Sequence, residues 1–448
     1  MNIIIIGAGE IGRHMAEKLA NRNHNLCVIE KDESTIEDLA EILDVKFLHG
    51  EGASIEILSQ ADTSRCELFL ALTSDDNSNL VAASIAKSLG AKKAIARVSP
   101  QTYSEQWKFN HKRHFCIDHL FCPERLTAVD LAKYVRNPES VAVEELANGQ
   151  IELQQVLIAP NCKSSNIQIR DMNLQERVRI TLIQRNGKNI IPHAGETLQT
   201  GDLVTLIGRP PQLEKTVTTF NEQSAPPAKQ NVVILGGGQY GYALAKLLEG
   251  ANCKIRLMEK ERERAQELSE ILSNSITILN VDGTSVRDLR EEQVDDADFF
   301  IAVTGEDEDN IMMCLQAKNL GAKHTIALVQ RSDYANFITE QMGISAVASP
   351  RISTSRELLQ FVTSERWQHA FTLTDGIEVI AFPITAKSPI VNKKFTEIPH
   401  IEGAPFITII RDTGAFVPIG KDTITQGDTL FAIVTPESRI RAIKAYTR

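Results

Sequence analysis

Short apolar runs alternate with longer amphipathic stretches over the first 135 residues. Apolar runs of about five residues are typical of buried strands, and the stretches between them, such as 33–43 and 77–89, have the spacing of helices. Six strands separated by short helices predict a doubly wound, mostly parallel sheet. The expected strands are residues 2–6, 26–29, 45–48, 68–72, 94–98 and 119–121. A further helix is expected from Pro123 to about Tyr134.

The pattern changes at about residue 141 and predicts a small α+β domain. The turn-forming pairs Asn186-Gly187 and Gly201-Asp202 separate its later strands. The polar segment 221–230 contains two prolines and is typical of a linker. The expected strands are 141–145, 151–157, 179–183 and 203–207, with brief helices at about 168–172 and 212–220.

The sequence then repeats: the motifs of its first part recur in the same order from residue 231 onward. The apolar run 231–235 precedes a second glycine-rich turn at 236–241, as 2–6 precedes the turn at 7–12. The later matches are Glu30-Lys31 with Glu259-Lys260, 50–54 with 281–285, 70–73 with 301–304, Asn79 with Asn310, 89–92 with 320–323, and Arg185 and Gly201-Asp202 with Arg411 and Gly427-Asp428.

An ordered series of matches of this kind indicates an internal duplication. The expected fold class is α/β: two Rossmann-like, doubly wound parallel sheets, each followed by a small α+β subdomain. The corresponding domains are 1–135, 141–222, 231–362 and 369–448.

The composition is that of a soluble globular protein, with 42% apolar and 24% charged residues. No apolar run approaches the roughly 18 residues of a membrane span, and the start of the chain lacks the basic region of a signal peptide. A net charge of -10 argues against nucleic acid as the main partner. The seven cysteines form no C-x-x-C pair. We therefore expect reduced, mostly buried thiols in a cytoplasmic protein.

The first glycine-rich turn carries the strongest chemical signal. A strand at 2–6 leads into G-x-G-x-x-G, and a helix follows from about Ile11. The first glycine permits a tight turn, the second lets a phosphate approach the backbone, and the third lets helix and strand pack closely. The helix N-terminus then directs free N–H groups at the phosphate. The expected phosphate contacts are Gly7, Ala8, Gly9, Glu10, Ile11 and Gly12.

Glu30 ends the second expected strand, 23 residues after Gly7, near the spacing of a ribose-binding carboxylate. A carboxylate at this place repels a 2′-phosphate, so the sequence favours NAD(H) or ATP/ADP over NADP. The turn at 50–54 is expected to approach the adenosine.

These residues resemble the TrkA family, the cytosolic nucleotide-binding subunits of bacterial Trk potassium uptake systems, which are built from tandem RCK (or KTN) domains. The most specific parts are residues 7–12, Leu72-Thr73-Ser74-Asp75-Asp76 and 301–307, together with the duplicated order. The resemblance implies a regulatory protein without catalytic turnover that responds to NAD(H) or ATP/ADP. It also implies a homotetrameric ring on the inner face of the plasma membrane, beneath a TrkH- or TrkG-like potassium-translocating subunit.

The resemblance also implies nucleotide contacts by Thr73 and Ser74 and a phosphate contact by Arg97. Thr73 and Ser74 end the fourth expected strand, at the sheet edge where ligands bind in open α/β sheets. The alternative for these two is a helix cap, and for Arg97 a salt bridge at the strand end.

The second glycine-rich turn retains most of the motif. Its expected contacts are Gly236, Gly237, Gly238, Gln239, Tyr240, Gly241, Glu259 and Thr304. Two positions differ, because Tyr240 replaces Ile11 and Leu328 stands where the first half has Arg97. Loss of a cation that pairs with phosphate removes roughly 1.5–3 kcal/mol, although Arg331 lies close in sequence. We therefore expect the second site to bind more weakly or to prefer a different nucleotide.

Two polar clusters have simpler explanations than a metal site. The acids Asp75-Asp76 and 306–309 lie at expected helix starts, where carboxylates are stabilising, and a divalent-cation site is the alternative. His111 and His114 lie near Cys116 and His119, but this spacing has no recognisable ligand framework.

The competing function is an NAD-dependent oxidoreductase with two Rossmann domains. Such an enzyme needs an acid/base group beside the nicotinamide. Residues 151–220 contain a single histidine, His193, and residues 370–448 contain a single histidine, His400. A transcriptional sensor would need a helix-turn-helix and a basic face, and the sequence offers no candidate for either. The two turns therefore favour nucleotide sensing over catalysis.

Overall fold

The structure is a computed structural model. It describes residues 1–20, 24–100, 102, 109–136, 142–146, 150–158, 162, 164–185, 187–220, 229–330, 335–359, 361–362, 368–374, 377–411 and 413–446. The chain forms two compact units, which are described separately. Unit 1 contains Met1–Ala132 and Ala228–Phe361, and unit 2 contains Lys133–Pro227 and Val362–Arg448.

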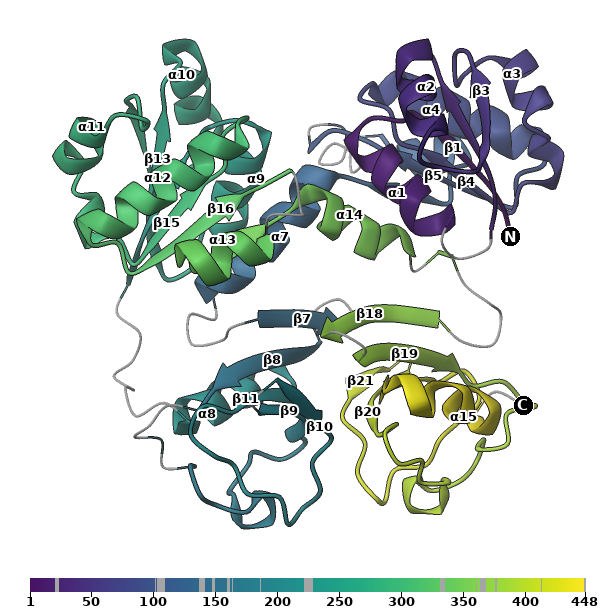
Figure 1. Ribbon diagram of the computed structural model, residues 1–448, viewed down its shortest axis with the longest axis vertical. Helices are drawn as coiled ribbons and strands as arrows, with labels where there is room; N and C mark the ends of the chain where they lie inside the picture. Colours follow the sequence, from purple (N-terminus) through teal and green to yellow (C-terminus); the bar gives the residue numbers. More distant parts are fainter. Residues whose placement is uncertain are drawn as a thin grey trace. The chain divides into compact units, whose positions relative to one another are not determined.

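The first half of unit 1 is a six-stranded parallel sheet in the order β3-β2-β1-β4-β5-β6 (Figure 1). Its strands are β1 (Asn2–Ile6), β2 (Asn25–Glu30), β3 (Lys46–His49), β4 (Leu68–Ala71), β5 (Lys93–Arg97) and β6 (His119–Phe121). Its helices are α1 (Glu10–Ala20), α2 (Glu33–Ala40), α3 (Ile55–Gln60), α4 (Asp76–Ser88), α6 (His111–His114) and α7 (Pro123–Arg136), with a 3₁₀ turn at Thr63–Arg65.

The second half of unit 1 repeats this arrangement, with the strand order β14-β13-β12-β15-β16-β17. Its strands are β12 (Gln230–Leu235), β13 (Cys253–Glu259), β14 (Ile276–Asn280), β15 (Phe299–Ala302), β16 (His324–Leu328) and β17 (Ala346–Ala348). Its helices are α9 (Gln239–Leu248), α10 (Arg262–Ile271), α11 (Val286–Glu291), α12 (Asp307–Leu320), α13 (Ala335–Met342) and α14 (Pro350–Leu359), with a 3₁₀ turn at Val294–Asp296.

The apolar runs explain why these strands are central. In β1, Ile3 to Ile6 are all buried, because helices cover both faces of a parallel sheet. Ile4 and Ile6 share one core with Leu58 of α3 and Ala83 of α4. Alternation directs Ile3 and Ile5 to the opposite face, and α1 contacts β1 and β2.

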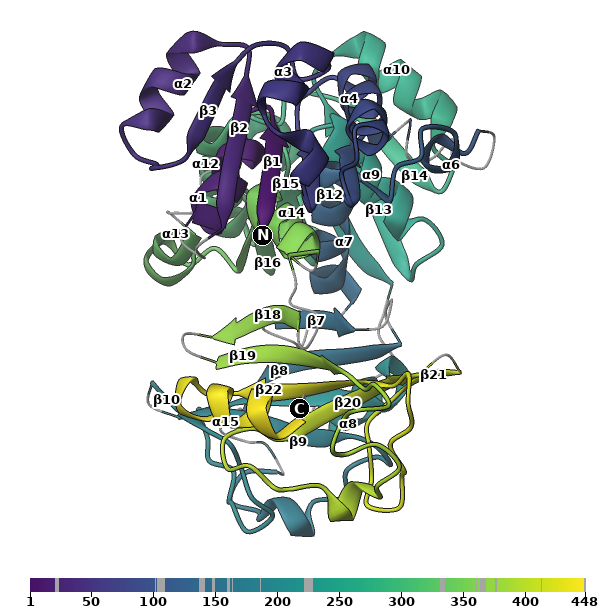
Figure 2. The ribbon, with the colours of Figure 1, turned by 90° about the vertical axis from the view of Figure 1, so that its right-hand side faces the viewer.

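The two halves of unit 1 contact each other through α14 of the second half, which meets both α1 and α7 of the first. Helix α14 of the second half packs against α1 of the first half (Figure 2). Asp130 of α7 accepts hydrogen bonds from Ser353 Oγ (2.6 Å) and Arg356 Nη1 (3.2 Å) of α14. Segments more than 220 positions apart therefore build one interface.

Unit 2 contains two antiparallel five-stranded sheets, in the orders β10-β9-β11-β8-β7 and β18-β19-β22-β20-β21. The first has β7 (Ala142–Leu146), β8 (Ile151–Leu157), β9 (Arg179–Arg185), β10 (Lys188–Ile190), β11 (Leu203–Gly208), α8 (Pro210–Phe220) and a 3₁₀ turn at Ile169–Asp171. The second has β18 (Gln368–Thr374), β19 (Ile377–Pro383), β20 (Phe406–Arg411), β21 (Gly414–Phe416), β22 (Thr429–Val434), α15 (Pro436–Tyr446) and a 3₁₀ turn at Phe395–Glu397.

The fold class predicted from the sequence is confirmed: two doubly wound parallel sheets are each followed by a small α+β fold. The small folds share one apolar core, in which Leu153 and Ile207 pack with Val379 and Ile433. In the described part of the chain, no helix has both the length and the apolar character needed to cross a membrane.

In each small fold of unit 2, the repeated Arg and Gly-Asp motifs form an ion pair between a partly exposed arginine and a buried aspartate. Arg185 donates from Nε and Nη2 to Asp202, both at 2.8 Å, and Arg411 donates likewise to Asp428 at 2.7 and 2.8 Å. Burial alone would raise the pKa of Asp202, but the hydrogen bonds from Arg185 and from the Gln199 amide outweigh burial and lower it. The motif therefore stabilises the fold.

Acid should weaken unit 2 through these carboxylates. The pKa of Asp202 is lower in the folded chain than the value of about 3.9 in an unfolded one. Its stabilising contribution is therefore present above about pH 4 and is lost as the pH falls through the folded pKa. We expect hydrogen exchange in β9 and β11, corrected for intrinsic rates, to accelerate more on acidification in the wild type than in Asp202→Asn. Equal acceleration in both proteins would contradict this assignment.

Candidate functional site

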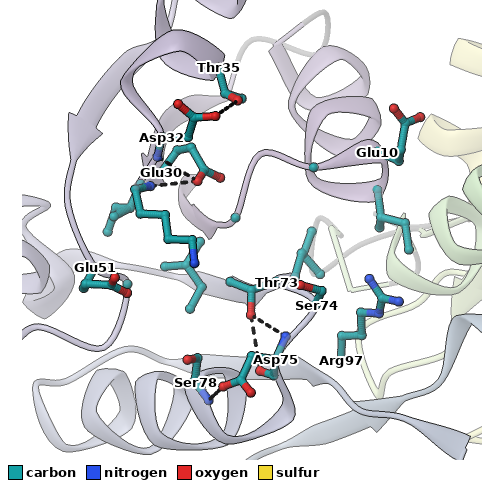
Figure 3. A pocket seen from close by; sticks show the side chains of 18 of the residues that line it. Glu10, Glu30, Asp32, Thr35, Glu51, Thr73, Ser74, Asp75, Ser78 and Arg97 are labelled. Atoms are coloured by element: carbon teal, nitrogen blue, oxygen red, sulfur yellow. Dashed lines mark hydrogen bonds between the residues drawn. The ribbon is translucent and has the colours of Figure 1, made fainter.

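A cleft of about 580 Å³ lies at the carboxyl ends of β1, β2, β4 and β5 (Figure 3). It is at the point where the strand order reverses between β1 and β4, the usual ligand position in open α/β sheets. Eight of the ten residues predicted in the first half line it: Gly7, Gly9, Glu10, Ile11, Glu30, Thr73, Ser74 and Arg97. The other two, Ala8 and Gly12, are buried in the turn.

The glycine-rich turn packs closely against the start of α1. Gly7 has φ of +86°, and a Cβ on Gly12 would lie 1.9 Å from the Gly7 carbonyl oxygen. A side chain at Gly12 is therefore incompatible with this packing. A Cβ on Gly9, in contrast, meets no atom within 4 Å. The open side of Gly9 faces the cleft, where a phosphate would approach the N-terminus of α1.

Glu30 links the glycine-rich turn to the end of β2. Its Oε2 accepts a hydrogen bond from the Ala8 N–H at 2.6 Å, and its Oε1 accepts from the Lys31 and Asp32 amides at 2.8 and 3.1 Å. These three bonds orient the carboxylate at the cleft wall. The residue predicted to bind ribose therefore also positions the phosphate turn.

Asn79 connects the ends of β4 and β5, although we assigned it no role from the sequence. Its Oδ1 accepts from the Thr73 N–H (3.0 Å) and the Thr73 hydroxyl (2.8 Å). Its Nδ2 donates to the carbonyl oxygens of Thr73 (2.9 Å) and Arg97 (3.0 Å). One buried amide therefore positions two predicted site residues. The sequence signal for this role was the asparagine at the matching position of the second half, Asn310.

Arg97 lies in the cleft wall and is also ion-paired. Its Nη2 lies 3.1 Å from Glu124 Oε1 at the start of α7. Both the predicted phosphate contact and the alternative salt bridge are therefore compatible with its position.

Tyr240 and Gln330 of the second half line the same cleft. Burial and the nearby Glu124 carboxylate raise the pKa of the Tyr240 phenol, so it is neutral at physiological pH.

Charge is unevenly distributed around the cleft. Figure 3 shows Glu10 and Arg97 on one side and Glu30, Asp32 and Glu51 on the other. The side-chain hydrogen bonds from Ser34 and Thr35 lower the pKa of Asp32. The lining also contains Lys31 and Asp75. Neutral ribose and adenine groups suit the side with three carboxylates, whereas Arg97 offers a cation to a phosphate on the other side.

The second glycine-rich turn has the same backbone geometry. A Cβ on Gly241 would lie 1.9 Å from the Gly236 carbonyl oxygen, and the Gly237 N–H donates to Glu259 at 2.8 Å. The Thr304 N–H donates to Asn310 Oδ1 at 2.8 Å. As in the first turn, a Cβ on Gly238 meets nothing within 4 Å. Gln239 begins α9.

The side chains around the second turn differ from those of the first. Leu328 is 1% exposed, so β16 brings no cation to the place of Arg97. Arg331, the predicted substitute, lies outside the described residues. Instead, Arg264 Nε donates to the Gly237 carbonyl oxygen at 2.9 Å. Sequence reasoning missed Arg264 because it stands where the first half has Thr35.

Family models place the chain among known proteins. The TrkA-N domain matches residues 3–121 and 232–350, and the TrkA-C domain matches residues 153–221. The chain belongs to the TrkA family. The resemblance drawn from the glycine turns and the duplication is therefore confirmed.

Curated TrkA relatives match over nearly their whole length. A Trk system potassium uptake protein TrkA homolog 1 from Methanosarcina mazei is 32% identical, covering 98% of this chain and 99% of the relative. The homolog from Archaeoglobus fulgidus is 31% identical, covering 96% of each. The TrkA protein from Haemophilus influenzae is 28% identical, covering 99% of this chain and 98% of the relative.

Solved structures have the same fold as this TrkA-family chain. The crystal structure of the GsuK RCK domain aligns with a TM-score of 0.63 at 19% identity, covering 99% of this chain and 94% of the other. The GsuK channel bound to NAD aligns with a TM-score of 0.64 at 19% identity, covering 99% and 78%. At this identity the likeness shows the fold.

The acids at the helix starts of both TrkA-N domains have structural partners. Asp75 caps α4 by accepting from the Ser78 amide at 2.6 Å. Asp76 accepts from the Ser99 amide at 2.9 Å, and Asp307 accepts from the Gln330 amide at 2.8 Å. Among the described residues, no three His, Cys, Asp or Glu side chains are grouped so that they could hold a metal ion.

Proposed function

We propose that this TrkA-family chain is the nucleotide-sensing regulatory subunit of a potassium uptake system and has no catalytic turnover. NAD(H) or ATP/ADP binds in the first cleft through the ten residues predicted around the first glycine-rich turn. The eight residues predicted around the second turn form a second site that binds more weakly or prefers a different nucleotide. Four copies of the chain, each with the four domains expected from the sequence, assemble as a homotetrameric ring. The ring acts on a membrane-embedded potassium-translocating subunit.

The observation that carries this proposal is the first cleft itself. It combines an open phosphate position at Gly9, a carboxylate oriented by three backbone N–H groups at Glu30, and a cation at Arg97. Among the described residues that line it, none is a histidine, and the carboxylates of Glu30, Asp32 and Asp75 already accept hydrogen bonds from backbone N–H groups. This lining suits binding of a nucleotide better than general acid/base chemistry. The relatives named for potassium uptake support the transport role.

Regulation follows if nucleotides bind two arrangements of unit 1 with different affinity. A ligand shifts an equilibrium only by its differential affinity for the two states. Tyr240 and Gln330 of the second half line the cleft of the first half, so a bound nucleotide would contact both halves. Nucleotide binding is therefore coupled to the position of one half of unit 1 against the other.

The test is to copurify the chain with a Trk-type potassium-translocating subunit and to measure ion flux with and without NADH, NAD, ATP and ADP. We expect association, and a flux that changes with at least one nucleotide. A chain that does not associate, together with a flux insensitive to all four nucleotides, would contradict the proposal.

Isothermal titration should resolve two unequal nucleotide sites per chain. The first cleft has Arg97, whereas the buried Leu328 stands at the equivalent place in the second half. One charge-assisted hydrogen bond to phosphate is worth about 1.5–3 kcal/mol, or roughly tenfold or more in affinity. Two equal and identical sites per chain would refute this prediction.

A further inference from the structure

Arg351 reaches the first phosphate turn from the second half of unit 1. It is the second residue of α14, the helix that packs on α1. Its Nη2 is ion-paired with Oε2 of Glu10, the first residue of α1. Glu10 and Pro350 both line the first cleft. The pair therefore connects the second half to the edge of the cleft where phosphate is expected.

The guanidinium of Arg351 has unused hydrogen-bonding capacity. The Arg351 side chain is 17% exposed, and its buried Nε has no hydrogen-bond partner. Glu10, in contrast, is 60% exposed and well solvated. A buried cation with an unsatisfied N–H gains free energy from a further anion. Glu10 alone therefore does not satisfy Arg351.

We propose that Arg351 binds the terminal phosphate of a nucleoside di- or triphosphate in the first cleft. In doing so it leaves Glu10 and pairs with the phosphate instead. This inference rests on the proposed function and names a further specificity residue of the same site. A phosphate at the N-terminus of α1 lies beside the Glu10 carboxylate, which repels it. Movement of Arg351 toward the phosphate replaces that repulsion with a charge-assisted contact.

When Arg351 exchanges Glu10 for a phosphate, nucleotide binding in the first cleft acts directly on the second half. Arg351 belongs to α14, and α14 also contacts α7 through Asp130. A phosphate that attracts Arg351 therefore acts on the interface between the halves. Because the attraction depends on terminal phosphate charge, its effect should follow the order ATP, ADP, AMP, with none for adenosine.

The test is a double-mutant cycle with Glu10→Gln and Arg351→Gln in the full chain, measured by titration with ATP, ADP, AMP and adenosine. Arg351→Gln has two effects in the wild type, because it removes the cation and exposes the Glu10 charge. In the Glu10→Gln background only the direct contact remains. We expect Arg351→Gln to weaken ATP binding there by roughly tenfold or more, and to leave adenosine binding unchanged.

Arg356→Gln is the matched control, because Arg356 lies on the same helix and pairs with Asp130. We expect it to change ATP affinity by less than about twofold, within the usual effect of a partly exposed ion pair. Equal ATP affinities of Glu10→Gln and the double mutant would overturn the inference and leave the proposed function intact. A wild-type chain that binds none of these nucleotides or NADH would instead overturn the proposed function.

Discussion

Gly9→Ala is expected to weaken nucleotide binding in the first cleft by roughly tenfold or more while the fold stays unchanged. A Cβ at Gly9 meets no protein atom within 4 Å, so alanine fits without strain. The same Cβ occupies the space where a phosphate must approach the backbone at the start of α1. Isothermal titration and thermal unfolding of the variant measure the two effects separately.

Gly238→Ala is the matched control, since Gly238 holds the same place in the second turn and also faces open space. If the tighter site is the first cleft, Gly238→Ala leaves its affinity unchanged. Loss of the tighter site in Gly238→Ala, with Gly9→Ala unaffected, would show that the two halves have been assigned in the wrong order.

Asn79→Ala is expected to lower the free energy of opening of the β4 and β5 ends by roughly 3 kcal/mol. The substitution leaves the Thr73 N–H and the Arg97 carbonyl without their partner. Each unsatisfied group of this kind costs about 1–3 kcal/mol when buried. Hydrogen exchange of peptides that cover β4 and β5 measures the change, expected as roughly a hundredfold loss of protection.

Asn280→Ala provides the comparison for Asn79→Ala. The Asn280 amide also donates to two carbonyl oxygens, those of Glu259 (2.9 Å) and Lys260 (3.0 Å), but it lies at the exposed end of β14. Water replaces its bonds, so we expect a loss below about 1 kcal/mol. If Asn79→Ala lost no more hydrogen-exchange protection around its site than Asn280→Ala loses around its own, Asn79 would not position the ends of β4 and β5.

Local sequence patterns predicted the parts of the fold that depend on local physics. The four isoleucines of β1 are buried on both faces, and the strand has the predicted bounds. The helix after Gly9 begins at Glu10, one residue before the predicted start. The helix α3 was expected only as one of the short helices between strands, without bounds. The strand β10 was not predicted, because Lys188 and Asn189 leave Ile190 as its one apolar residue and no apolar run marks it.

Side chains that reach the cleft from a distant segment were beyond sequence reasoning. Tyr240 was assigned to the second turn, and the structure also places it in the lining of the first cleft. Glu124, the partner of Arg97, lies 27 positions away, and Arg351 lies in the other half. A single sequence contains no pairing information between such positions, whereas the spacing from Gly7 to Glu30 is fixed by one strand–helix–strand unit.

The duplication explains both what the halves share and where they differ. Each keeps the glycine turn, the carboxylate at the end of its second strand and the buried asparagine. Only the first half adds an arginine at the end of its fifth strand. One scaffold therefore presents two glycine-rich turns with the same backbone geometry and different side chains around them.

The most direct test of nucleotide-controlled potassium uptake is a flux measurement in vesicles that contain the potassium-translocating subunit. The wild-type chain, Gly9→Ala and Gly238→Ala are each added with and without the nucleotide that binds most tightly. We predict that flux responds to nucleotide with the wild type and with Gly238→Ala, but not with Gly9→Ala, although all three chains associate with the membrane subunit. A full flux response with Gly9→Ala, in a variant that titration shows to have lost nucleotide binding, would contradict the proposed function.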